Sequence, residues 1–165
     1  MKQLLGLGCL ILLLSACATA PSPSPMQRRN VQTKTFQGVS YSNVFRAVKT
    51  VLQDEGYIIK EQDYDGGMML AVAQKSSWSW EMVKIFERDK KDRDTLMSVE
   101  FEVSFSFEEI AKKIVETRLT IQKVEYYSNG GRKGQEVFDP ALYKNIYDKI
   151  SVEIERRKAL GRQLQ

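Results

Sequence analysis

The sequence contains no histidine. This absence excludes Ser-His-Asp and Cys-His catalysis, in which an imidazole is the general base, and every histidine-ligated metal site. Nucleotide binding has no support either, because no glycine-rich loop follows a predicted strand and opens a helix. Glu108 and Glu109 are adjacent carboxylates, but they fall in a predicted turn where solvent surrounds them. We therefore predict no catalytic, cofactor-binding or metal-binding residue and expect a non-catalytic protein.

Cysteine is scarce: the chain has two, Cys9 and Cys17, and both lie near the N-terminus. The rest of the chain has no thiol for a disulfide, so its fold must depend on its core. The chain also lacks a large excess of positive or negative charge. Removing residues 1–16 would take away only Lys2 among the charged residues, leaving 24 basic and 21 acidic side chains. The resulting net charge of +3 does not predict nucleic-acid binding.

The N-terminal segment has the layout of a secretory signal. Lys2 is its only basic residue, and an apolar run extends from Leu4 to Leu14. The small residues Ser15 and Ala16 follow, as is typical of a cleavage site. The apolar run, at roughly 11 residues against the ~20 needed, is too short for a permanent membrane span.

Leu14-Ser15-Ala16-Cys17 resembles the lipobox of bacterial lipoproteins. The resemblance implies cleavage after residue 16 and attachment of acyl chains such as palmitate to Cys17. In families of bacteria with two membranes, aspartate after the acylated cysteine commonly retains the protein at the inner membrane, and here that position is Ala18. The implied location is the outer membrane, with the domain facing the periplasm; surface display stays open. The alternative is an ordinary cleaved signal in which Cys17 is incidental.

Residues 17–34 are predicted to form the lipidated N-terminus and an extended tether. Three of the four prolines alternate with serine over residues 21–25, which favours polyproline geometry and disfavours helix or sheet. At ~3 Å per residue, such a tether reaches up to ~50 Å from a membrane. Arg28 and Arg29 are either solvated in this linker or close to anionic headgroups.

Residues 35–160 predict a single α+β domain, followed by a polar tail over residues 161–165. Asp65-Gly66-Gly67 favours a tight hairpin turn, and Asp139-Pro140 is a typical helix start. Residues 128–134, rich in glycine, predict a flexible loop. The elements that we expect are helices over residues 40–55 and from 139 to about 160, and strands over residues 57–64, 68–75, 95–107 and 114–127.

The strand over residues 95–107 carries the clearest pattern. Met97, Val99, Phe101, Val103 and Phe105 alternate with serine and glutamate, which indicates one buried and one solvated face. Because a one-sided sheet must bury its apolar face, we predict a two-layer sandwich: an antiparallel sheet of at least four strands with two helices on one face. This order of elements is similar to small α+β domains of outer-membrane assembly lipoproteins.

In the strand over residues 114–127, the apolar phase changes near Gln122-Lys123. The change predicts either a bulge or a change of strand partner at that point. Residues 76–94 are harder to assign, and a short helix over residues 79–88 followed by a charged loop is the favoured interpretation. Trp78 and Trp80 in this segment are either core residues or, if both are exposed, a contact for a partner or a lipid.

Arg156 and Arg157 lie near the end of the last predicted helix. There they either stabilise the helix dipole or form a docking patch. Together, the anchor, the tether and the missing catalytic set favour an envelope lipoprotein that presents its domain to a protein partner. The alternative is a periplasmic domain that binds a small ligand or lipid between its sheet and its helices.

Overall fold

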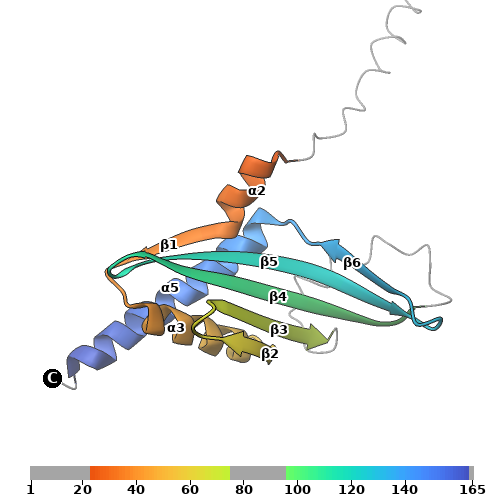
Figure 1. Cartoon of the computed structure of the whole chain (residues 1–165). Coiled ribbons are helices and arrows are strands. Elements are labelled where there is room, and N and C mark those ends of the chain that lie inside the picture. The colour runs from red at the N-terminus through yellow and green to blue at the C-terminus, as the bar shows by residue number, and fades with distance from the viewer. Residues whose placement is uncertain (1–22, 75–95, 164–165) are drawn as a thin grey trace, which may run out of the picture.

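A computed structural model of the chain describes residues 23–74 and 96–163 (Figure 1). Along the chain, a helix, a strand and a second helix come first, five strands follow, and a final helix ends the described part. Their bounds are α2 Pro25–Gln32, β1 Thr33–Gln37, α3 Tyr41–Asp54, β2 Ile58–Asp63, β3 Met68–Gln74, β4 Leu96–Ala111, β5 Ile114–Tyr127, β6 Arg132–Glu136 and α5 Pro140–Gln163.

The strands form one antiparallel sheet in the order β1-β5-β4-β3-β2, and β6 pairs with β5 beside β1. Helices α3 and α5 contact each other and lie on the same face of the sheet, behind it in Figure 1. The predicted α+β class with an antiparallel sheet of at least four strands and two covering helices is therefore confirmed. Helix α2 is an additional element.

The β4–β5 hairpin supplies most of the apolar face. Phe105 lies opposite Leu119 and Val103 opposite Ile121, and all four side chains are almost completely buried. The intervening residues, such as Ser106, are on the other face. This alternation is the pattern that predicted the strand, and the buried side faces α3 and α5. Strand β4 extends further than expected, so the turn falls at residues 112–113, where Lys113 has a φ of 61°.

Helix α3, expected over residues 40–55, spans Tyr41–Asp54. Its apolar residues at helical spacing, among them Val44, Val48 and Val51, are buried against the sheet. Gly56 ends the helix with a φ of 83°, a conformation that glycine adopts without strain. Ser40 occupies the N-cap, but its side chain makes no capping hydrogen bond; its backbone carbonyl accepts from Val44 instead.

The change of phase in β5 marks a change of strand partner. Residues Ile114 to Arg118 pair with β1, whereas Gln122 to Tyr126 pair with β6 on the same edge. No bulge occurs near Gln122-Lys123; the irregularities in the β4–β5 register lie at its two ends. Beyond the partner change, Val124 is buried although it lies on the phase opposite to Ile121.

Two predictions for the polar segments are wrong. The flexible loop expected over residues 128–134 is shorter, because its last residues, 132–134, belong to β6. An antiparallel ladder to β5 offsets the weak strand propensity of this glycine-containing segment. Residues 25–34, expected in the extended tether, form α2 and the start of β1. Ser24 and Gln27 make a reciprocal capping box, and Pro25 occupies the first helical turn, where proline loses no needed hydrogen bond.

Several expectations lie outside the described residues. They concern the signal segment with Cys17, the helix over residues 79–88, and both tryptophans, Trp78 and Trp80. Helix α5 continues to Gln163, into residues that we assigned to a polar tail.

Substitution of Gly67 by alanine tests the β2–β3 turn. Gly67 has a φ of 66°, and a Cβ there would lie 2.4 Å from the backbone oxygen of Phe107, whose amide donates to the Gly67 carbonyl. Gly67→Ala should lower the free energy of unfolding by about 2 kcal/mol or more, measured by urea denaturation. Gly130→Ala is the matched control, because Gly130 also has positive φ but open space around it; its cost should be about 1 kcal/mol. Equal losses in both variants would contradict the close approach to β4.

Candidate functional site

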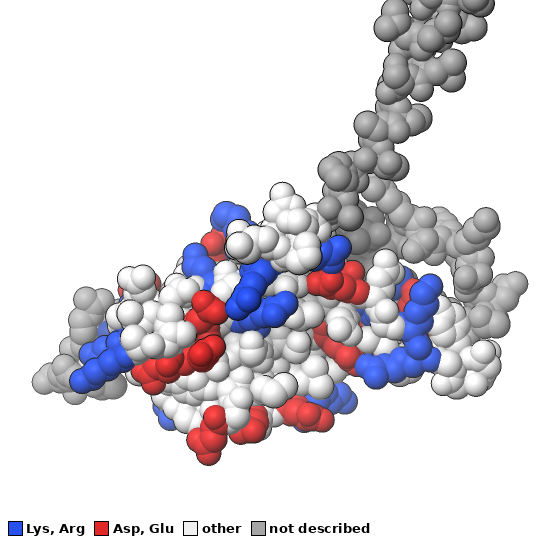
Figure 2. All heavy atoms as spheres, turned by 45° about the horizontal axis from the view of Figure 1, so that its top comes forward, with Lys and Arg blue, Asp and Glu red and all other residues white. Residues whose placement is uncertain are grey.

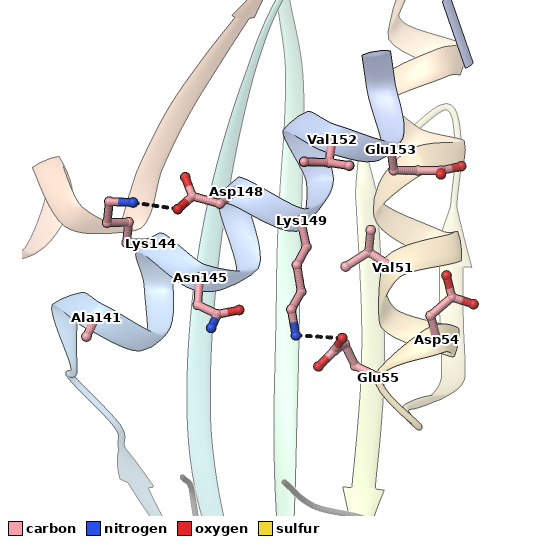
Figure 3. A pocket seen from close by; sticks show the side chains of 10 residues that line it. All are labelled: Val51, Asp54, Glu55, Ala141, Lys144, Asn145, Asp148, Lys149, Val152 and Glu153. Carbon is pink, nitrogen blue, oxygen red and sulfur yellow. Dashed lines mark hydrogen bonds and ion pairs between the residues drawn. The ribbon is translucent and has the colours of Figure 1, made fainter. Parts of the chain in front are cut away.

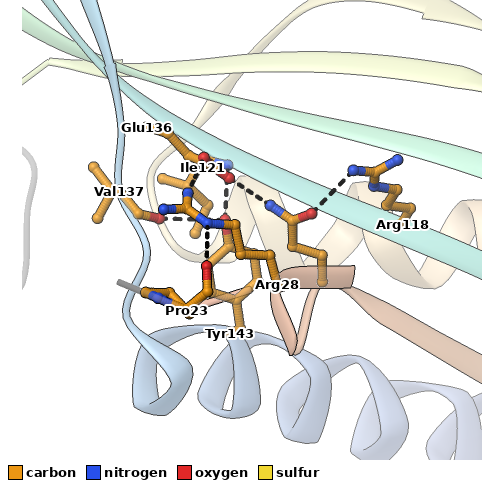
Figure 4. Close-up of polar contacts among 8 residues, drawn as sticks. Pro23, Arg28, Arg118, Ile121, Glu136, Val137 and Tyr143 are labelled. Atoms are coloured by element: carbon orange, nitrogen blue, oxygen red, sulfur yellow. Dashed lines mark hydrogen bonds and ion pairs between the residues drawn. The ribbon is translucent and has the colours of Figure 1, made fainter. Parts of the chain in front are cut away.

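A polar network attaches α2 to the domain (Figure 4). The Arg28 guanidinium donates to Glu136 of β6 at 2.7 Å and to the Pro23 carbonyl at 3.3 Å. Gln32, almost completely buried, donates to the same Glu136 carboxylate at 2.6 Å and accepts from Arg118 at 3.1 Å. Arg28 is therefore part of the fold rather than of a solvated linker.

Two buried tyrosines of α5 complete this region. The Tyr143 hydroxyl accepts from the Ile121 amide at 3.3 Å and donates to the Val137 carbonyl at 3.2 Å. Ile121 lies where β5 changes from β1 to β6, so the hydroxyl stands in for a missing strand partner. The Tyr147 hydroxyl shares its one proton between the carbonyls of Gln32, at 2.6 Å, and Thr117, at 3.2 Å. Burial raises the pKa of both tyrosines, which keeps their hydroxyls protonated and able to donate these hydrogen bonds.

Tyr143→Phe should lower the free energy of unfolding by about 1–3 kcal/mol, because it leaves the buried Ile121 amide without an acceptor. Denaturation with urea measures the loss. Tyr64→Phe is the control, since Tyr64 is half exposed and its hydroxyl makes no hydrogen bond within the described residues. If Tyr143→Phe unfolds at the same urea concentration as the wild type, the hydroxyl does not replace a strand partner.

The predicted contact residues Arg156 and Arg157 both pair with Glu153. The carboxylate of Glu153 is 2.6 Å from Arg156 and 2.7 Å from Arg157, and Arg157 also donates to Thr50 of α3 at 2.8 Å. The hydrogen bond from Arg156 is the main reason that the pKa of Glu153 lies below its usual range. The two ion pairs lie within α5, and the hydrogen bond from Arg157 to Thr50 links α5 to α3. A partner contact through either arginine stays a prediction, and Arg156, with a side chain 55% exposed, is the more accessible of the two.

A surface hollow of about 690 Å³ lies between α3 and α5 (Figure 3). Its charged side chains largely neutralise each other: Lys144 pairs with Asp148, and Lys149 pairs with Glu55 at 2.7 Å. The exposed side chain of Val152 lies at its rim. A partner would have to compete at this hollow with ion pairs that the domain already makes.

A second groove runs between α3 and the edge strand β2. It consists of two hollows, of about 570 and 520 Å³, which share Lys49 and Gln62. Three basic residues line it, Arg46 and Lys49 from α3 and Lys60 from β2, and no carboxylate does. Within the described part of the chain, none of the three makes an ion pair. Each of its hollows is smaller than the one between α3 and α5, but its basic side chains are available to a partner. This groove is therefore the better candidate for binding.

The local sequence explains the groove. Ser42, Arg46, Lys49 and Gln53 recur at helical spacing and form one polar stripe of α3, beside the apolar stripe that faces the core. Aromatic rings support one end: Phe45 lies 5.2 Å from Tyr64, measured between ring centroids. Sequence reasoning missed this site. The polar stripe of α3 can be seen in the sequence, but nothing in the sequence shows that β2, the strand beside it, is at the edge of the sheet.

The face of the molecule in Figure 2 carries acidic and basic side chains side by side. Such mixing gives no broad field of one sign on this face, in agreement with the small net charge. Recognition would therefore depend on local arrangements such as the α3–β2 groove.

The chain matches no known family model, and no curated protein is significantly similar to it. None of the helices within residues 23–74 and 96–163 combines the length and apolar character needed to cross a bilayer. Over the same residues, no cluster of three or more cysteine and acidic side chains could hold a metal ion.

Proposed function

We propose that the chain is a membrane-anchored lipoprotein of a bacterial envelope, non-catalytic, whose domain binds a protein partner. The observation that carries the partner-binding role is the α3–β2 groove, which combines unpaired basic side chains with aromatic support on the surface. The anchor rests on Leu14-Ser15-Ala16-Cys17, which lies outside the described residues.

The packed interior favours a protein partner over an enclosed small ligand. Phe45 of α3 lies 4.9 Å from Phe107 of β4, and Phe105 lies 6.3 Å from Tyr147 of α5, between ring centroids. Aromatic rings from both layers thus meet between the sheet and the helices, where a ligand-binding domain would have its pocket. The alternative, a periplasmic small-ligand or lipid-binding domain, requires a cavity in that layer.

The position of α2 suits an anchored module. Helix α2 leads directly into β1 at one side of the sheet, whereas β2 is the strand at the opposite edge (Figure 1). Because Arg28 and Gln32 fix α2 to the domain, a tether that ends at residue 23 would leave from the β1 side. The α3–β2 groove would then face away from the attachment point.

Cys17→Ser should move the protein from the outer-membrane fraction to a soluble or uncleaved form. Each buried CH₂ contributes about 0.8 kcal/mol to membrane binding, and a single chain binds only marginally, so stable anchoring requires the two or three chains that lipoproteins carry. Immunoblots of separated inner- and outer-membrane fractions measure the shift.

Cys9→Ser is the matched control for this experiment, because it makes the same change inside the apolar run and leaves the expected acylation site intact. Unchanged membrane association of Cys17→Ser would refute the lipobox interpretation. Protease added to intact cells should spare the domain, and digestion there would place it on the cell surface instead.

Photo-crosslinking in intact cells tests partner binding. A photoreactive amino acid at position 62, in the α3–β2 groove, at position 144, beside the α3–α5 hollow, or at position 133, on β6, reports a neighbour of each surface. We expect a discrete protein adduct at one or more of these positions. The absence of adducts at all three positions, with the protein correctly anchored, would remove the case for a protein partner.

A further inference from the structure

Strand β2 offers backbone groups for pairing. It is the last strand of the sheet, and no other strand in the described part of the chain lies on its outer side. All of its residues except Ile59 are exposed. The outer edge of an antiparallel strand presents N–H and C=O groups from alternate residues, and these can pair with an incoming extended segment.

The two faces of β2 differ in charge. Gln62 lies opposite the buried Met69, so its side chain is on the helix side, where it lines the groove with Arg46 and Lys49. Glu61 and Asp63 lie opposite Leu70 and Met68, the neighbours of Met69 in β3, and therefore on the other face. The helix side of this edge is basic, and the opposite side is acidic.

We propose that β2 binds an extended, acidic segment of the protein partner as an additional strand, whose alternate acidic side chains lie in the α3–β2 groove. The inference rests on the proposed function and names the chemistry of its partner. Side chains two residues apart on a strand are separated by roughly 7 Å and point to the same face. Successive acidic side chains would therefore occupy the two hollows, near Arg46, Lys49 and Lys60.

The side chains between the acidic ones would lie on the opposite face, near Glu61 and Asp63. Acidic residues at those positions would be repelled, so the segment should alternate acidic with neutral or basic residues. The turn between β2 and β3 limits where the segment can bind. The pKa of Tyr41 is raised first by burial, then by Tyr64, and then by the charges of Asp63 and Asp65. Carboxylates of the segment are therefore favoured along Arg46 to Lys60 rather than beside the turn.

Lys60 bears on the selectivity of this edge. The β2–β3 register is irregular between Ile59 and Glu61, which leaves Lys60 without a Cα partner in β3. Irregular pairing and exposed charge are devices that prevent neutral strands from adding to an edge. A segment whose carboxylates match Lys60 and the α3 side chains satisfies these charges, so the same features that prevent aggregation would select the partner.

Synthetic peptides test the proposal on the full-length acylated protein in detergent micelles. The probes are fluorescein-labelled heptapeptides with alternating threonine and glutamate, and the same peptides with lysine in place of glutamate. Fluorescence anisotropy should show binding of the glutamate peptide at least tenfold tighter than of the lysine peptide. Equal or absent binding of both peptides would overturn the proposal.

Charge reversal identifies the surface. The double variant Arg46→Glu, Lys49→Glu should weaken binding of the glutamate peptide at least tenfold. The control, Lys133→Glu with Lys144→Glu, makes the same change in net charge at exposed positions on β6 and α5 and should leave binding within twofold. Circular dichroism confirms that both variants are folded. Equal weakening in both would show attraction to net charge alone and would contradict a groove.

N-methylated peptides identify backbone pairing. A peptide methylated at the backbone nitrogen of every glutamate is blocked along one edge of its strand. A peptide methylated at the backbone nitrogen of every threonine is blocked along the other edge. One pattern should abolish binding and the other should retain it, because only one edge of the added strand faces β2. Retention by both patterns would exclude strand addition even if the charge effect is present.

The outcomes separate this inference from the proposed function. Adducts at position 144 or 133 but not at 62 would support a protein partner but contradict its binding at the α3–β2 groove. An adduct at 62 should map, by mass spectrometry of the crosslinked peptide, to an acidic extended segment of the partner. If sedimentation instead shows a dimer that Lys60→Glu disrupts, the occupant of the edge is a second copy of this chain, and the proposal is wrong.

Discussion

The pairing of β4 with β5 is the constraint on which the rest of the domain depends. Two long strands with one apolar face cannot remain exposed, so the other elements are arranged to cover or extend them. Helices α3 and α5 bury the face that contains Phe105 and Leu119. The outer edge of β5 is too long for β1 alone and is shared with β6, and the Tyr143 hydroxyl bonds to Ile121 at the junction.

The sequence determines the elements whose pattern reflects burial. Alternation over residues 95–107 and the stripes of α3 and α5 state directly which side chains face the core, so the α+β sandwich is predictable. Elements held by polar contacts are not. Helix α2 and β6 contain few apolar residues, and their positions depend on Arg28, Gln32 and Glu136, three residues up to 108 positions apart in sequence. Contacts between residues so far apart leave no pattern in any short stretch of the sequence.

The same distinction applies to the candidate site. The basic stripe of α3 is visible in the sequence, because Arg46 and Lys49 have helical spacing without an intervening acidic residue on that face. Whether this stripe forms a binding site depends on the element that lies beside it. The strand order makes β2 an edge, and the hairpin register places Gln62 on the helix side and Glu61 on the other. Strand order follows from long-range pairing, so a local pattern cannot show where the groove is.

Attachment and recognition would occupy opposite edges of one sheet. An edge strand is an aggregation hazard unless it is paired, covered or charged. On the β5 side, β1 and β6 pair with the edge, and α2 is bound to it through Glu136. On the β2 side, charge and an irregular register are the only protection within the described residues. A tether leaving from the first side keeps the second accessible. Under this arrangement, the edge that the fold leaves unpaired is also the one that an anchored domain can present to a partner.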